Sequence, residues 1–266
     1  MSALDKYEAR VDAVDSLLCV GLDSDIKRLP PEFNSVEFPQ LAFNRRIIDQ
    51  TAGYASAFKF NMAFYEAAGA AGWQQLKDSL DYLRRHQPGA LIISDAKRGD
   101  IGNSSAAYAR AIFDVLGFDA VTLSPYLGSD ALQPFLDYKD KACIIICRSS
   151  NAGSGELQNL TVSGRPLWQA VAETVVGAWN VNDNCMLVAG ATFPEEMAAI
   201  RTIAGDMTLL VPGIGAQGGD IGPVLGAGLN SRGKGLIINA SRSIIFAEDP
   251  AAAAKSMRDE INHFRP

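Results

Sequence analysis

The chain has 266 residues, of which 48% are hydrophobic and 20% charged, and its formal net charge is −6. This composition suits a folded protein with a large core, and the acidic balance with only short basic pairs argues against a nucleic-acid-binding face. No apolar run approaches the ~18 residues of a membrane span. The charged, helix-like N-terminus is unlike a signal peptide. We therefore expect a soluble, cytoplasmic protein with no membrane or nucleic-acid partner.

The four cysteines each fall in an apolar, strand-like run; they are Cys19, Cys143, Cys147 and Cys185. Buried thiols in a reducing cytosol explain this placement better than disulfide bonds do. No Cys/His spacing suggests zinc. The sequence therefore predicts free, buried cysteines.

Short apolar runs typical of buried strands recur along the whole chain. They are residues 17–23, 57–61, 91–97, 120–125, 142–149, 186–191, 208–215 and 235–242. Segments rich in Ala, Leu, Glu and Arg separate these runs and predict helices. Examples are residues 40–51, 63–86, 104–116, 167–179 and 194–203. This alternation of strand and helix predicts a parallel sheet.

About eight strand–helix units in ~250 residues predict an α/β fold, a (β/α)₈ TIM barrel. We find no linker, low-complexity tract or break in composition, so residues 1–266 are expected to form a single domain. The alternative is an open, doubly wound sheet. It is less favoured because no Gly-x-Gly-x-x-Gly follows the first expected strand.

Charged residues gather at the end of the third expected strand, in residues 91–106 (LIISDAKRGDIGNSSA). Residues two apart on a strand point the same way, so Asp95 and Lys97 should project side by side, with Asp100 just beyond. Lys59 and Asn61 are paired in the same way on the second strand. Such charges are costly to bury unless they pair. One interpretation is therefore a purely structural ion-pair network.

Polar side chains also end five other expected strands, which favours a functional interpretation. These ends carry Asp23, Lys59 with Asn61, residues 148–151, residues 215–219, and Ser241 with Arg242. In a barrel the C-terminal strand ends meet at one mouth, where active sites are built. A structural network would not need ionisable or amide groups at six different strand ends.

A candidate phosphate site follows the seventh expected strand. Its glycines would leave backbone N–H groups free to approach an anion; they are Gly213, Gly215, Gly218 and Gly219. A helix expected to begin near Asp220 would add its N-terminal dipole. Arg242, from the next strand, can bind phosphate oxygens through two parallel hydrogen bonds. Together with Gln217, these residues predict a phosphorylated ligand.

Residues 95–101 (DAKRGDI), with Lys59-x-Asn61 before them and residues 215–219 (GAQGG) after them, resemble the orotidine 5′-phosphate decarboxylase family. The likeness runs from Asp23 to Arg242. Residues 149–155 (SSNAGSG) look like the longer bacterial branch of the family. One departure is residues 240–242 (ASR), where many relatives have Gly just before the Arg. It weakens the backbone part of the phosphate site but not the role of the Arg.

The resemblance implies conversion of orotidine monophosphate to uridine monophosphate and CO₂ in de novo pyrimidine biosynthesis, with no metal and no organic cofactor. The C6 carbanion left by CO₂ lies in the plane of the ring, so electrostatics must stabilise it. By resemblance, Lys97 would stabilise and protonate C6, while Asp95 would face the substrate carboxylate and hold Lys97. Lys59 and Asp100 would complete an alternating chain of charges that keeps Lys97 protonated and oriented.

The resemblance also implies a homodimer with shared active sites, in which Asp100, Ile101 and Ser104 reach the site of the partner subunit. The remaining substrate-binding residues belong to the same chain; by resemblance they are Asp23 for the ribose, Asn61, Ser150 for the pyrimidine edge, and Gln217, Gly218 and Arg242 for the phosphate. Ser149 is the alternative to Ser150 for the pyrimidine.

Two other functions remain open. Sugar-phosphate decarboxylases and hexulose-phosphate synthases of the same superfamily share Asp95-x-Lys97-x-x-Asp100 but use a divalent metal held by carboxylates. Lys59 argues against them, because a cation there opposes metal binding. The other alternative is a catalytically silent nucleotide-binding protein. The complete set of Lys59, Asp95, Lys97 and Asp100 argues against it, because a sensor needs no proton donor beside a buried carboxylate.

Overall fold

The computed structural model describes residues 1–214 and 220–266, and in them eight parallel strands close into a barrel. Their order around the barrel is β1-β10-β9-β8-β5-β4-β3-β2. The strands are β1 (Leu18–Gly21), β2 (Ala57–Asn61), β3 (Leu91–Arg98), β4 (Ala120–Leu123), β5 (Ala142–Arg148), β8 (Cys185–Ala189), β9 (Leu209–Pro212) and β10 (Leu236–Ala240). The predicted (β/α)₈ barrel is confirmed, and the open doubly wound sheet is wrong.

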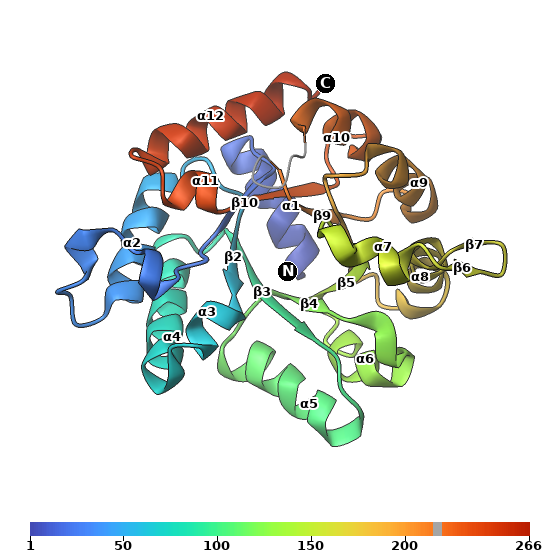
Figure 1. Cartoon of the computed structure of the whole chain (residues 1–266), viewed down its shortest axis with the longest axis horizontal. Coiled ribbons are helices and arrows are strands. Elements are labelled where there is room, and N and C mark those ends of the chain that lie inside the picture. Colours follow the sequence, from blue (N-terminus) through green and yellow to red (C-terminus); the bar gives the residue numbers. More distant parts are fainter. Residues whose placement is uncertain (215–219) are drawn as a thin grey trace.

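Helices cover the outside of the barrel and one of its ends, as Figure 1 shows. They are α1 (Ala3–Val14), α2 (Pro39–Thr51), α3 (Met62–Glu66), α4 (Gly69–His86), α5 (Gly102–Arg110), α6 (Ser129–Leu136), α7 (Gly155–Gln158), α8 (Leu167–Thr174), α9 (Pro194–Ala204), α10 (Ile221–Gly228), α11 (Arg242–Ile245) and α12 (Pro250–His263). A small hairpin, β6 (Thr161–Val162) with β7 (Arg165–Pro166), lies outside the barrel.

The apolar runs form strands because both faces of each strand are covered. Every residue of β1, β4 and β8 is buried, as expected for strands with helices on one side and the barrel interior on the other. Each of the eight predicted runs overlaps a barrel strand, and β3 and β8 each extend one residue beyond their run. The four cysteines are free and buried, as predicted. None of the described helices is both long and apolar enough to cross a membrane.

The helix predicted over residues 63–86 is divided into α3 and α4. Gly69, the first residue of α4, has a φ of +64°, which an uninterrupted right-handed helix cannot contain. The regular helices predicted over residues 104–116 and 167–179 end in π-helical turns, Ala111–Val115 and Val175–Trp179. The residue pattern located these helices but did not show where the backbone departs from the α-helical form.

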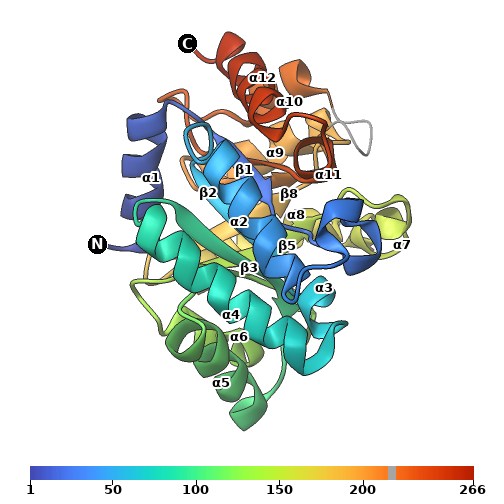
Figure 2. The ribbon, with the colours of Figure 1, turned by 90° about the vertical axis from the view of Figure 1, so that its left-hand side faces the viewer.

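Helix α1 covers the N-terminal end of the barrel. Figure 2 shows it at one side of the molecule, with α7 and α11 at the other. The Lys6 ammonium lies 2.7 Å from a carboxylate oxygen of Asp119, just before β4. The guanidinium of Arg10 donates to the carbonyl of Ala55, just before β2. Because α1 contacts the chain ahead of several strands, the opposite end is the open mouth.

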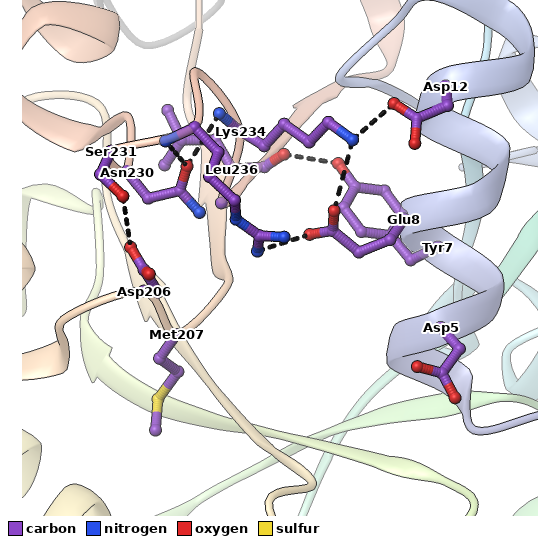
Figure 3. Close-up of polar contacts among 12 residues, drawn as sticks. Asp5, Tyr7, Glu8, Asp12, Asp206, Met207, Asn230, Ser231, Lys234 and Leu236 are labelled. Carbon is purple, nitrogen blue, oxygen red and sulfur yellow. Dashed lines mark hydrogen bonds and ion pairs between the residues drawn. The ribbon is translucent and has the colours of Figure 1, made fainter.

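A cluster of polar contacts at the start of β10 also holds α1 (Figure 3). The buried Tyr7 hydroxyl donates to the carbonyl of Leu236. The Lys234 ammonium lies 2.5 Å from Asp12 and 3.5 Å from Glu8. Burial raises the pKa of the Tyr7 phenol well above its ordinary value, so this side chain acts as a neutral donor.

Candidate active site

A cavity of about 290 Å³ opens among the C-terminal ends of the strands. Charged and polar side chains line part of it, and they include Asp23, Lys59, Asn61, Asp95, Lys97, Thr122, Ser149, Ser150, Asn151, Asn239, Ser241 and Arg242. An apolar wall of Ile146, Val188, Leu210, Pro212 and Ile214 completes it. The closed barrel thus brings together side chains that are up to 220 positions apart in sequence, from Asp23 to Ser243.

Four charges of alternating sign form a chain along the cavity wall. The Lys59 ammonium lies 3.6 Å from Asp23 Oδ1 and 3.1 Å from Asp95 Oδ2. The other oxygen of Asp95, Oδ1, lies 2.7 Å from the Lys97 ammonium. Lys59 and Asp95 stand on neighbouring strands, β2 and β3, and the predicted juxtaposition of Asp95 and Lys97 is present.

The charges differ in exposure and therefore in how strongly they interact. The Lys59 side chain is 4% exposed, whereas that of Lys97 is 56% exposed. Burial alone would lower the pKa of Lys59, but Asp23 and Asp95 raise it above its ordinary value. Burial alone would raise the pKa of Asp95, but Lys59 and Lys97 hold it well below its usual range. Lys59 is thus a fixed cation and Asp95 a fixed anion at neutral pH.

Thr122, on β4, also contacts this chain of charges. Its hydroxyl donates to Asp95 Oδ1 at 2.9 Å and accepts from the backbone N–H of Lys97 at 3.0 Å. Sequence reasoning missed Thr122, as it missed Asn239 on β10. A polar residue inside an apolar strand was the available signal, because an inward-facing hydroxyl or amide near a strand's C-terminal end reaches the mouth.

The loop after β5 presents two serines to the cavity in different ways. Gln158 accepts from the backbone N–H of Ser149 at 3.0 Å and donates to its hydroxyl at 2.8 Å. The Ser149 hydroxyl in turn donates to Asn151. The Ser150 hydroxyl has no hydrogen-bond partner within residues 1–214 and 220–266. A Cβ at Gly190 would lie 2.8 Å from the backbone nitrogen of Ser150, so the absence of a side chain there permits this close packing.

Arg148 is not at the mouth, although its place at a strand end suggested that it would be. Its side chain is 3% exposed and pairs with Glu196, with the guanidinium 3.9 Å from the centre of the Phe193 ring. It also donates to the hydroxyl of Ser154 and to Gln158. A buried guanidinium needs such partners, and these hold it away from the cavity. Arg148 therefore anchors the serine loop.

The structure describes only part of the predicted phosphate site. Arg242 and Gly213 both line the cavity. Asp220 caps α10, accepting from the N–H of Gly222 at 3.3 Å, so the helix predicted near Asp220 is present. Residues 215–219, with Gln217 and Gly218, lie outside the described residues, and their predicted contacts to phosphate stay predictions.

The three residues predicted to serve a partner subunit do not line the cavity of their own chain. Asp100 accepts from the backbone N–H of Ile101, and Ser104 lies in the first turn of α5. The Ile101 residue is 63% exposed, which is unusual for a large apolar side chain. In the described parts of the chain, no group of three or more His, Cys, Asp or Glu side chains is arranged to hold a metal ion.

Comparison with known proteins identifies the family. The model of the orotidine 5′-phosphate decarboxylase / HUMPS family matches residues 16–257. An orotidine 5′-phosphate decarboxylase of Herpetosiphon aurantiacus is 47% identical over 262 residues, covering 98% of this chain and 96% of the relative. The solved OMP decarboxylase of Leishmania donovani superposes with a TM-score of 0.90 at 44% identity, covering 100% of this chain and 99% of that one. The chain belongs to the orotidine 5′-phosphate decarboxylase / HUMPS family.

Proposed function

We propose that this protein is a carboxy-lyase that converts orotidine 5′-monophosphate to uridine 5′-monophosphate and CO₂, a step of pyrimidine biosynthesis. The observation that carries the proposal is the chain Asp23–Lys59–Asp95–Lys97, with contacts of 3.6, 3.1 and 2.7 Å along the cavity wall. It places one exposed ammonium, Lys97, beside a permanently ionised carboxylate. That arrangement suits a reaction in which a carboxylate leaves and a proton arrives at the same carbon.

The reaction begins with the substrate carboxylate at C6 placed beside Asp95. When the C6–carboxylate bond breaks, its electron pair stays on C6 and CO₂ departs. The Lys97 ammonium stabilises this carbanion electrostatically and then donates a proton to C6. Asp95 holds Lys97 in position throughout, and buried Lys59 keeps Asp95 ionised. No residue of the chain is oxidised or reduced: the negative charge of the carboxylate stays on C6 when CO₂ leaves, and the proton from Lys97 neutralises it. Lys97, left as a neutral amine, regains its proton from solvent.

In this proposal, the remaining residues of the cavity bind the substrate. Asp23 and Asn61 would bind the ribose, and the hydroxyl of Ser150 would read the pyrimidine edge. Arg242, with Gln217 and Gly218, would bind the phosphate. The apolar wall would pack against the base. Binding energy from the phosphate, remote from C6, can be used to lower the barrier at the reacting carbon.

The active unit in this proposal is a homodimer of single-domain chains, residues 1–266. Asp100, Ile101 and Ser104 lie at the rim, outside the cavity of their own chain, so they are available to complete the cavity of a partner. The partner's contribution would close the site over the base and exclude water.

A metal-dependent sugar-phosphate decarboxylase or synthase is the second candidate. It shares Asp95, Lys97 and Asp100 but needs carboxylates free to coordinate a divalent ion. The ammonium of Lys59 lies 3.6 Å from Asp23 and 3.1 Å from Asp95, so a cation already occupies the space between these carboxylates. A silent nucleotide-binding protein would not need this arrangement of proton donor and buried anion.

The deciding experiment follows the fall in ultraviolet absorbance when the protein is mixed with orotidine 5′-monophosphate in excess EDTA. We expect full turnover by the wild type and loss of at least about 10²-fold for Lys97→Ala, as removal of a positioned acid predicts. Lys255→Ala, on the exposed surface of α12, is the matched control. Wild-type activity that needs a divalent metal would favour the second candidate, and inert wild-type protein that binds nucleotide would favour the third.

A further inference from the structure

The β3–β4 pairing is irregular beside the charged cluster. Ser94 pairs with Val121, and the next pair is Arg98 with Leu123. Three residues of β3, Asp95 to Lys97, therefore stand opposite the single residue Thr122. Such a bulge removes backbone groups from the regular ladder and re-aims the side chains it carries.

Lys97 adopts an unusual backbone conformation in this bulge. Its φ is +48°, in the left-handed region that residues other than Gly rarely occupy. Its backbone N–H has no ladder partner there and donates instead to Thr122 Oγ1 at 3.0 Å. The hydroxyl of Thr122 thus supplies the hydrogen bond that the bulge takes away.

The same hydroxyl holds the carboxylate. Thr122 Oγ1 donates to Asp95 Oδ1 at 2.9 Å, and that oxygen also accepts from the Lys97 ammonium at 2.7 Å. Thr122 is 1% exposed, so water does not compete for these bonds. The Lys97 side chain is 56% exposed, so packing does not fix its direction. Its aim depends on its backbone and on Asp95, and Thr122 contacts both.

We propose that Thr122 is a positioning residue for the decarboxylation: its hydroxyl holds the bulged backbone of Lys97 and the carboxylate of Asp95 in one geometry. This inference rests on the proposed function. The Thr122 hydroxyl donates one hydrogen bond to Asp95 and accepts one from the backbone N–H of Lys97, and no proton is transferred. Misplacement of a reacting group by about 1 Å can cost ~10²-fold in rate.

The test compares Thr122→Val, which keeps the shape and removes the hydroxyl, with Thr122→Ser, which keeps the hydroxyl. Thr51→Val is the matched control, because Thr51 is also buried and its hydroxyl donates to the Ile47 carbonyl in α2, away from the cavity. We expect Thr122→Val to lower kcat by about 10–100-fold. Its affinity for the product nucleotide should change less than about 3-fold, because the phosphate and pyrimidine contacts remain. Thr122→Ser and Thr51→Val should stay near the wild-type kcat.

Thr122→Cys covers the case in which the valine variant does not fold. A thiol is a weak hydrogen-bond donor and acceptor, so the kcat of Thr122→Cys should fall between the values for Thr122→Ser and Thr122→Val. A crystal structure of the valine or cysteine variant should show Lys97 outside the left-handed region or its ammonium moved from Asp95. Unchanged kcat, or equal losses in kcat and nucleotide affinity, would overturn the positioning role while leaving decarboxylation intact. A wild-type protein that does not decarboxylate would instead refute the proposed function itself.

Discussion

The side chain of Lys59 is only 4% exposed, and its buried positive charge is stabilised by the two carboxylates beside it, Asp23 and Asp95. Removing one member of a buried ion pair leaves the other without compensation, which typically costs ~3–5 kcal/mol. We therefore expect Lys59→Ala to lower the free energy of unfolding by roughly that amount, measured by urea denaturation. Lys255→Ala, at an exposed site on α12, should change it by less than about 0.5 kcal/mol. Equal effects would mean that Lys59 is not electrostatically coupled to Asp95.

The depressed pKa of Asp95 determines how its contribution to the stability of the fold depends on pH. Its contribution to stability is present above the ordinary carboxyl pKa of about 4 and is lost only as pH falls below it. The raised pKa of Lys59 has the opposite sign: its contribution is present below about pH 10 and is lost as pH rises further. We expect kcat, measured with saturating substrate, to be constant from about pH 5 to 7. A fall in kcat over that range would contradict this prediction.

Ser149 and Ser150 differ in what their hydroxyls already bind. Gln158 donates to the Ser149 hydroxyl at 2.8 Å, and that hydroxyl donates to Asn151 at 2.8 Å. Ser150→Ala should therefore weaken binding of the substrate and the product nucleotide by about 5–30-fold, as loss of one hydrogen bond of ~1–2 kcal/mol predicts. Ser149→Ala should weaken it much less. Isothermal titration with uridine monophosphate distinguishes the two, and the reverse order would make Ser149 the reader of the base.

At the scale of elements, α1 and β10 are joined by one fully buried hydrogen bond. The Tyr7 phenol donates to the Leu236 carbonyl and has almost no solvent contact. Tyr7→Phe keeps the ring but leaves that carbonyl without its donor, which should cost about 1–3 kcal/mol of stability. Tyr126→Phe is the control, because Tyr126 is 81% exposed. Thermal unfolding should show a lower Tm for Tyr7→Phe only, with kcat of the remaining folded protein unchanged because α1 lies at the opposite end from the mouth.

The strands were predictable because both faces of each barrel strand are buried. Consecutive residues must then all be apolar or small, as they are in β8. The division of the predicted helix at Gly69 was not predictable, because a glycine within a helical pattern can either continue the helix or adopt a positive φ that ends it. The juxtaposition of Asp95 and Lys97 was predicted from two-residue spacing on a strand and is present, although Lys97 lies in a bulge with a left-handed backbone. Thr122 was not, because its role depends on a bulge in the neighbouring strand, and such a register shift arises from pairing between segments far apart in sequence.

At the scale of the whole molecule, closure of the barrel determines which side chains line the cavity at its mouth and which do not. Strand ends converge, so Asp23, Lys59 and Asp95 meet within hydrogen-bonding or ion-pairing distance. The chain leaving β3 runs outward instead, and it carries Asp100 and Ile101 to the rim. We propose that a second molecule supplies Asp100 to the site, and this shared site is testable by subunit exchange.

Two inactive variants, Lys97→Ala and Asp100→Ala, should restore activity to one another when mixed. In a mixed dimer with shared sites, one site carries both substitutions and the other carries neither. Random exchange of equal amounts makes about half of the dimers mixed, each with one intact site of two, so roughly a quarter of wild-type activity should return in a closed two-fold dimer. Native mass spectrometry must show the mixed dimers, and each variant incubated alone is the control. Mixed dimers without activity would mean that Asp100 serves its own subunit, and that the exposed Ile101 beside it has a role other than completing a partner's site.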